Sequence, residues 1–86
     1  MNNDTLAALQ REIEQSNNKY GSFMSYAEGI AILREEYLEL EQEIFKNPFN
    51  RSKQRIDEEA IQVAAMALKI IEYRGDRWCF LNQKIK

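Results

Sequence analysis

The chain has 86 residues, 14 of them acidic and 12 basic, and a formal net charge of −2. A chain this short forms one domain at most and alone buries only about three fifths of its unfolded surface, so its core gains from self-association. Histidine is absent, which excludes Ser-His and Cys-His nucleophile pairs and the usual zinc sites. Any catalysis must therefore use carboxylates, a metal ion or lysine.

Cysteine content and hydropathy indicate the cellular compartment. The single cysteine, Cys79, allows no intrachain disulfide, which is typical of the reducing cytosol. The first residues lack the basic and apolar segments of a signal peptide. The longest apolar run, residues 60–71, is too short to span a bilayer and contains Gln62 and Lys69. We therefore expect a cytoplasmic protein that does not enter a membrane.

The first predicted helix covers residues 5–15. Asn3 or Asp4 is placed to cap it. Its apolar side chains recur at helical spacing and predict a buried stripe: Leu6, Leu9 and Ile13. The polar segment 16–21 that follows predicts a loop.

The second predicted helix begins after Ser22 or Ser25, and Ser25 forms a capping-box pattern with Glu28. Large apolar side chains recur along it at steps of three and four residues. One row at every seventh position predicts the buried seam: Phe23, Ile30, Tyr37 and Ile44. Glu36 flanks this seam. The helix should end near Lys46, because Pro48 disfavours helical backbone at the residue before it.

The third predicted helix begins between residues 50 and 52 and stops at Gly75. The connection before it is short, so the second and third helices should be antiparallel neighbours. Residues 60–71 are apolar on nearly every side, and such a helix must be buried all round. A chain this short cannot surround it, so we expect a second copy to do so. Residues 76–86 are expected to form a short helix or an extended tail.

Two polar pairs on these helices have the same spacing. Glu36 and Glu39 are three residues apart on the second helix, as are Glu59 and Gln62 on the third, so each pair shares one helix face. Antiparallel packing would gather three carboxylates and one amide, a ligand set for a hard divalent cation. A solvated helix is also rich in glutamate. However, Gln62 lies in an apolar run, and burying an unpaired amide costs about 1–3 kcal/mol.

These residues resemble a known family. The pattern consists of Leu33-Arg34-Glu35-Glu36-x-x-Glu39-Leu40 and, after a break, Glu59-x-x-Gln62-Val63-Ala64-Ala65-Met66-Ala67. It resembles the MazG-like superfamily of all-α nucleoside triphosphate pyrophosphohydrolases, in particular its short phage and bacterial members, over roughly residues 19–73. The resemblance implies an all-α, antiparallel bundle of three to four helices that residues 1–86 form as one domain and that a homodimer or tetramer completes. It also implies hydrolysis of a nucleotide between the α and β phosphates with Mg²⁺, or Mn²⁺, releasing pyrophosphate.

The resemblance also implies roles for individual residues. Glu36, Glu39 and Glu59 match three metal ligands of the family motif, and Gln62 occupies the fourth position, where the family has aspartate. The amide removes a negative charge, which should weaken Mg²⁺ binding. Glu35 would orient the attacking water. Basic residues would meet the phosphates: Lys53, Arg55 and Lys69.

Two functions remain open from the sequence. One is a pyrophosphohydrolase acting on (deoxy)nucleoside triphosphates or related nucleotides. The alternative is a catalytically inactive, oligomeric helical module that binds nucleotide or protein. A third interpretation, a small helical DNA-associated protein that uses Arg51, Lys53, Arg55 and the basic tail, is disfavoured, because facing glutamates repel phosphate unless a cation intervenes. Nucleic acid is therefore not an expected partner.

Overall fold

The computed structural model describes residues 1–20 and 25–73, which form three helices and no strand. They are α1 (Asn3–Tyr20), α2 (Tyr26–Ile44) and α3 (Lys53–Glu72). The predicted all-α class is confirmed. None of these helices combines the length and hydropathy needed to cross a membrane. The predictions for Phe23, Gly75 and the 76–86 tail lie outside the described residues.

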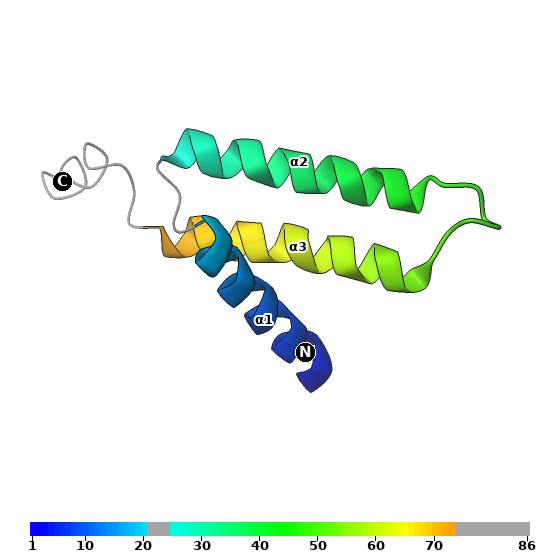
Figure 1. Ribbon diagram of the computed structural model, residues 1–86, viewed down its shortest axis with the longest axis horizontal. Helices are drawn as coiled ribbons and strands as arrows, with labels where there is room; N and C mark the ends of the chain where they lie inside the picture. The colour runs from blue at the N-terminus through cyan, green and yellow to red at the C-terminus, as the bar shows by residue number, and fades with distance from the viewer. Residues whose placement is uncertain (21–24, 74–86) are drawn as a thin grey trace, which may run out of the picture.

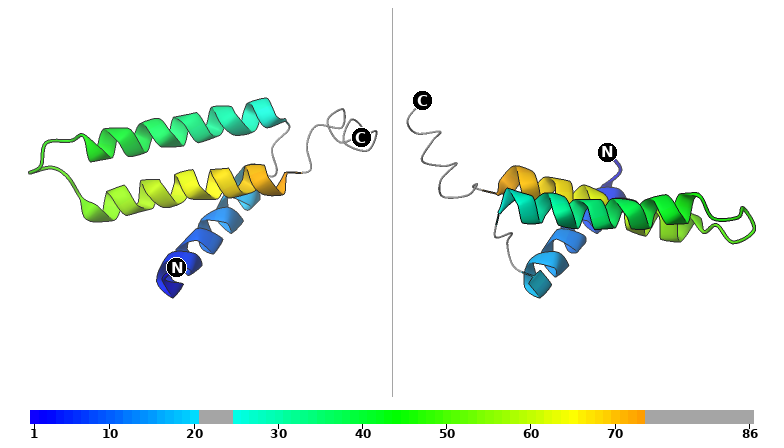
Figure 2. Two further views of the ribbon diagram at one scale, coloured as in Figure 1. Left: turned by 180° about the vertical axis from the view of Figure 1, so that it is seen from behind. Right: turned by 90° about the horizontal axis from the view of Figure 1, so that it is seen from above.

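α2 and α3 lie side by side and antiparallel, as predicted (Figure 1). Figure 2 shows from behind and from above that α1 crosses α3 obliquely instead of lying along it. Among the described helices, α1 contacts α3, and α3 is therefore the central element.

Serine caps determine where α2 and α3 begin. Ser25 Oγ accepts a hydrogen bond from the backbone N–H of Glu28 at 3.0 Å, which confirms the predicted cap. Ser52 Oγ accepts one from the backbone N–H of Arg55 at 3.3 Å. Each cap satisfies one of the N–H groups that a helix start leaves without an intrahelical partner.

α1 is longer than the sequence predicts, and the predicted loop over residues 16–21 is wrong for residues 16–20. Ser16 is buried, and its Oγ accepts a hydrogen bond from Lys69 Nζ on α3 at 2.7 Å. This tertiary contact holds polar residues of low helix propensity in the helix. At the other end, Asn2 and not Asn3 or Asp4 is the cap, since its Oδ1 accepts from the backbone N–H of Asp4 at 2.6 Å.

The core of the described residues is small. Its buried apolar side chains are Leu9 on α1 and Ala65 and Met66 on α3, of which Ala65 is fully buried. Partly buried apolar side chains surround them: Ile13, Ile32, Leu33, Ile61, Ala64, Leu68, Ile70 and Tyr73. Leu6 of the predicted stripe is 43% exposed, because α1 diverges from α3 toward its N-terminus (Figure 1).

The face that α2 turns toward α3 is more polar than predicted. The predicted seam is wrong at Ile30 and Tyr37, which are 56% and 51% exposed. The buried residues of α2 are instead Gly29 and Glu43. Glu43 is tolerated there because its Oε1 accepts from Lys46 Nζ at 2.9 Å and Arg55 Nε at 3.0 Å. Carboxylates therefore occupy part of the packing surface.

Replacing Ala65 with leucine should destabilise the protein by about 1–3 kcal/mol, because the larger side chain overpacks a fully buried position. Urea unfolding followed by circular dichroism measures the change. Ala31→Leu, at an exposed position of α2, is the matched control and should change stability by less than about 0.5 kcal/mol. Equal effects of the two substitutions would contradict the packing described here.

Candidate metal centre

Three carboxylates from two helices converge near the middle of the α2–α3 pair. One oxygen from each of Glu36 and Glu39 on α2 and Glu59 on α3 lies within 4.8 Å of the others. Glu36 and Glu59 are partly buried and Glu39 is exposed. The spacing of three residues puts Glu36 and Glu39 on one face, and the antiparallel packing brings Glu59 to it. The group is therefore accessible on one side.

Gln62, one turn beyond Glu59, completes the group. With its side-chain nitrogen toward the carboxylates, it donates hydrogen bonds to Glu36 Oε2 at 2.6 Å and to Glu59 Oε2 at 3.3 Å. The amide thus links the two helices. A polar side chain in an apolar run needs hydrogen-bond partners, and Glu36 and Glu59 supply them. Rotating the amide by half a turn would present its carbonyl oxygen to the same point, as a cation ligand requires.

Burial and mutual repulsion change the acidity of the group. The pKa of Glu36 rises from 4.5 to about 7, first because of burial and then because of the negative charges of Glu39 and Glu59. Burial and Glu39 also raise the pKa of Glu59, whereas Arg55 opposes this shift. Raised pKa values mean that the folded state holds these carboxylates at a cost when all are ionised.

Arg55 lies next to the group and is held by Glu43. Its Nε donates to Glu43 Oε1, and hydrogen bonds from Lys46 and Arg55 lower the pKa of Glu43. Glu43 Oε2 is buried and has no hydrogen-bond partner in the described part of the chain. The Nε bond leaves both terminal nitrogens of Arg55 without a hydrogen bond to a described residue, so the guanidinium is fixed and its outer donors are available.

The remaining predicted site residues lie apart from the carboxylates. Glu35 is exposed and is not part of the group. Lys53 pairs with Asp57, whose Oδ1 is 2.6 Å from its Nζ. Lys69 is buried and bonds Ser16, two turns or about 10 Å along α3 from Gln62. The roles predicted for these three residues stay predictions.

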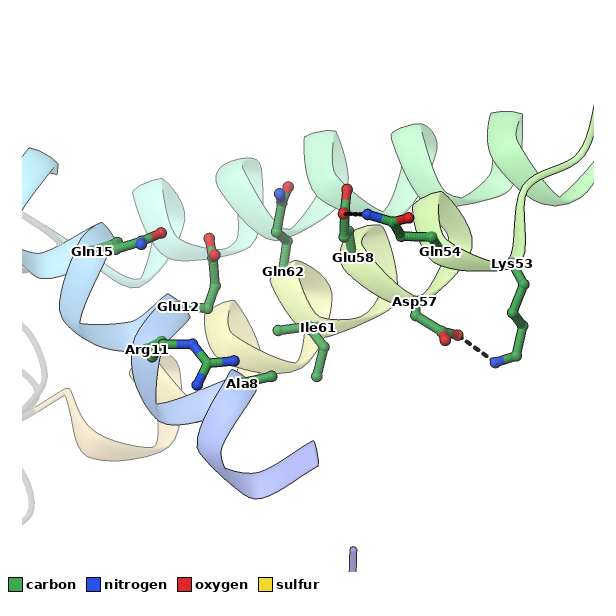
Figure 3. Close-up of a pocket in the computed structure, with 10 residues that line it drawn as sticks. All are labelled: Ala8, Arg11, Glu12, Gln15, Lys53, Gln54, Asp57, Glu58, Ile61 and Gln62. Carbon is green, nitrogen blue, oxygen red and sulfur yellow. Dashed lines mark hydrogen bonds and ion pairs between the residues drawn. The ribbon is translucent and has the colours of Figure 1, made fainter. Parts of the chain in front are cut away.

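Sequence reasoning missed the contribution of α1. A cleft of about 740 Å³ lies between α1 and α3, and Figure 3 shows Glu12 and Gln62 extending in the same direction from its two walls. The negative charge of Glu12 adds the weakest contribution to the raised pKa of Glu36. One signal in the sequence could have indicated this: Glu12 follows Leu9 by three residues, so a helix that buries Leu9 brings Glu12 to the edge of that face.

Comparison with protein-family models, curated proteins and solved structures finds no match to this chain. The candidate centre therefore depends on the geometry and charge of its own residues.

Proposed function

We propose that the chain is a Mg²⁺-dependent nucleoside triphosphate pyrophosphohydrolase whose metal ligands are Glu36, Glu39 and Glu59. The observation that carries the proposal is the convergence of these carboxylates, within 4.8 Å, on a partly open surface between two helices. Burial and like charge raise the pKa of Glu36 to about 7. A bound divalent cation would relieve this repulsion. Cation binding therefore explains why the fold keeps carboxylates that destabilise it when they are ionised.

The donor set fits a hard cation. Two oxygens on opposite sides of one Mg²⁺ ion are about 4.2 Å apart, twice the usual ligand distance. At most one pair of the three carboxylate oxygens can occupy opposite positions, and adjacent ligands of one Mg²⁺ ion are about 3.0 Å apart. The three oxygens lie within 4.8 Å of one another, so a bound ion would draw them closer together. Mn²⁺ accepts the same oxygen ligands.

The residues around the carboxylates have complementary tasks. A bound Mg²⁺ ion supplies charge neutralisation of the phosphates and a more acidic water molecule. Glu36, Glu39 and Glu59 hold the site in place from two rigid helices. Arg55, which Glu43 orients through its Nε, offers its outer N–H groups to phosphate oxygens. Glu35, exposed beside Glu36, is proposed to orient the attacking water.

We propose that a second copy of the chain covers the outer face of α2. Ile30, Tyr37 and Ile44 are 56%, 51% and 37% exposed on this face. Ile30 and Tyr37 line a groove of about 310 Å³. The rest of its lining consists of Leu33, Arg34 and Val63. A row of apolar side chains seven residues apart is the pattern of a helix that packs against another helix. A homodimer or tetramer in the cytoplasm is the assembly that we propose.

Hydrolysis assays test the proposal directly. Purified protein is incubated with each ribo- and deoxyribonucleoside triphosphate and Mg²⁺ or Mn²⁺, and released pyrophosphate is measured. We expect pyrophosphate with at least one nucleotide, and its loss by about 100-fold or more in Glu36→Ala, because a removed ligand disrupts metal-assisted hydrolysis. Equal release by both proteins would show a contaminating activity and would refute the proposal.

A second candidate, an inactive module that binds nucleotide or protein, is favoured by one observation. The Gln62 amide can donate to both Glu36 and Glu59, which satisfies the group without a cation. Absence of pyrophosphate with every nucleotide and either metal would select this candidate.

A further inference from the structure

We propose that the cleft between α1 and α3 is the nucleotide-binding site and that Arg11 binds the phosphates there; this inference rests on the proposed function. The cleft has a volume of about 740 Å³, within the usual range for a small-molecule site. Gln62 and Glu58 belong to its wall, and Gln62 also contacts Glu36 and Glu59. Gln62 therefore lies between the cleft and the carboxylate group.

The charges in the cleft leave one cation available. Lys53 is paired with Asp57 at 2.6 Å, and Glu58 accepts a hydrogen bond from Gln54 Nε2 at 3.1 Å. Arg11 forms no ion pair or hydrogen bond with any described residue. In Figure 3 its guanidinium lies at one end of the cleft and the Lys53–Asp57 pair at the other. Arg11 is therefore the cleft cation with no internal competitor for an anion.

Because the cleft is lined by negative charges, a polyphosphate should bind there only together with a divalent cation. Glu12, Asp57 and Glu58 line the cleft, and the carboxylate group adjoins it, so an uncompensated polyphosphate would be repelled. A polyphosphate that arrives with a divalent cation places the cation at the carboxylates and leaves phosphate oxygens for Arg11, whose planar guanidinium binds them in pairs. Ala8, Ile61, the Gln15 amide and the side-chain carbonyl oxygen of Gln54 remain for the nucleoside.

Binding measurements on the whole protein test the role of Arg11. The probes are α,β-methylene deoxynucleoside triphosphates, which resist cleavage at the proposed bond, and inorganic tripolyphosphate, both with Mg²⁺. We expect Arg11→Gln to weaken binding of both probes by about tenfold, the usual effect of losing one charge-assisted contact at an accessible site. Arg51→Gln, an exposed arginine in the connection between α2 and α3 that does not line the cleft, is the control and should bind both probes as the native protein does.

Each result decides between defined alternatives. Unchanged affinity in Arg11→Gln would overturn the inference, and Mg²⁺ binding and hydrolysis in the same protein would show that the proposed function stands. Weaker binding of the nucleotide alone would show that Arg11 contacts the nucleoside and would overturn its assignment to phosphate. Native protein that binds neither probe with Mg²⁺ and releases no pyrophosphate would end both proposals.

A second variant tests the location without changing charge. Ala8 lies in the cleft wall, so Ala8→Phe should fill part of the space and weaken nucleotide binding by about tenfold or more. Mg²⁺ binding, measured alone by calorimetry, should remain, because Ala8 is not part of the carboxylate group. A nucleotide affinity equal to that of the native protein would place the nucleotide elsewhere.

Discussion

Replacing Glu36 with glutamine is expected to stabilise the metal-free protein at pH 8 and to have a much smaller effect at pH 5. The pKa of Glu36 in the fold is about 7, against an ordinary 4.5. Below pH 4.5 the carboxyl is protonated in both the folded and the unfolded chain, so the group adds no penalty. Between pH 4.5 and 7 the unfolded chain releases the proton first, and stability falls as the pH rises.

Above pH 7 the native protein carries the whole penalty, which glutamine avoids. Water reaches this partly exposed side chain, so we expect a gain of about 1–2 kcal/mol at pH 8 and a melting temperature about 5–10 °C higher. Glu35→Gln is the matched control, because Glu35 is exposed and outside the group. A gain that is independent of pH, or equal in the two variants, would contradict the electrostatic origin.

The same two variants report on the metal. Mg²⁺ should stabilise the native protein and Glu35→Gln at pH 8, since a ligand that binds only the folded state raises the free energy of unfolding. The effect should be absent in Glu36→Gln, which lacks one of the proposed ligands. A Mg²⁺ response that is identical in all three proteins would locate cation binding away from Glu36.

The second large effect is expected from Gln62→Asp. The substitution removes the amide that donates to Glu36 and Glu59 at 2.6 and 3.3 Å and adds a fourth negative charge. At pH 8 without metal, we expect a loss of stability of about 1–3 kcal/mol. With Mg²⁺ present, the substitution should be favourable. The additional carboxylate should raise the affinity for the cation about tenfold, and the release of pyrophosphate should increase.

Gln62→Asn separates charge from length, because asparagine is as short as aspartate and neutral. It should lose stability without gaining Mg²⁺ affinity. Calorimetric titration with Mg²⁺ and thermal unfolding with and without the ion measure both quantities. If aspartate and asparagine give the same Mg²⁺ affinity, the charge at this position does not limit metal binding.

Features set by neighbouring residues were predictable from the sequence. The Ser25 cap and the antiparallel pairing of α2 and α3 follow from short-range rules, namely a capping serine and a brief connection. The meeting of Glu36, Glu39 and Glu59 follows from their spacing once that pairing exists.

Features set by distant contacts were not predictable. α1 extends to Tyr20 because Ser16 bonds Lys69, 53 residues later in the chain. The packing face of α2 contains Glu43, whose partners Lys46 and Arg55 replace apolar contacts, so the periodicity of large apolar residues pointed to the wrong face. Arg11 and Glu12 were missed because no local pattern specifies where α1 crosses α3.

The position of Leu9 has a consequence for how this molecule can evolve. Leu9 is one of the three buried apolar side chains of the described residues, and it lies on the same helix as Arg11. The segment that borders the cleft is therefore also a structural support of the hairpin behind it. Substitutions in α1 that alter ligand preference must therefore preserve the packing of Leu9 against α3, which leaves the side chains that face the cleft as the positions free to change.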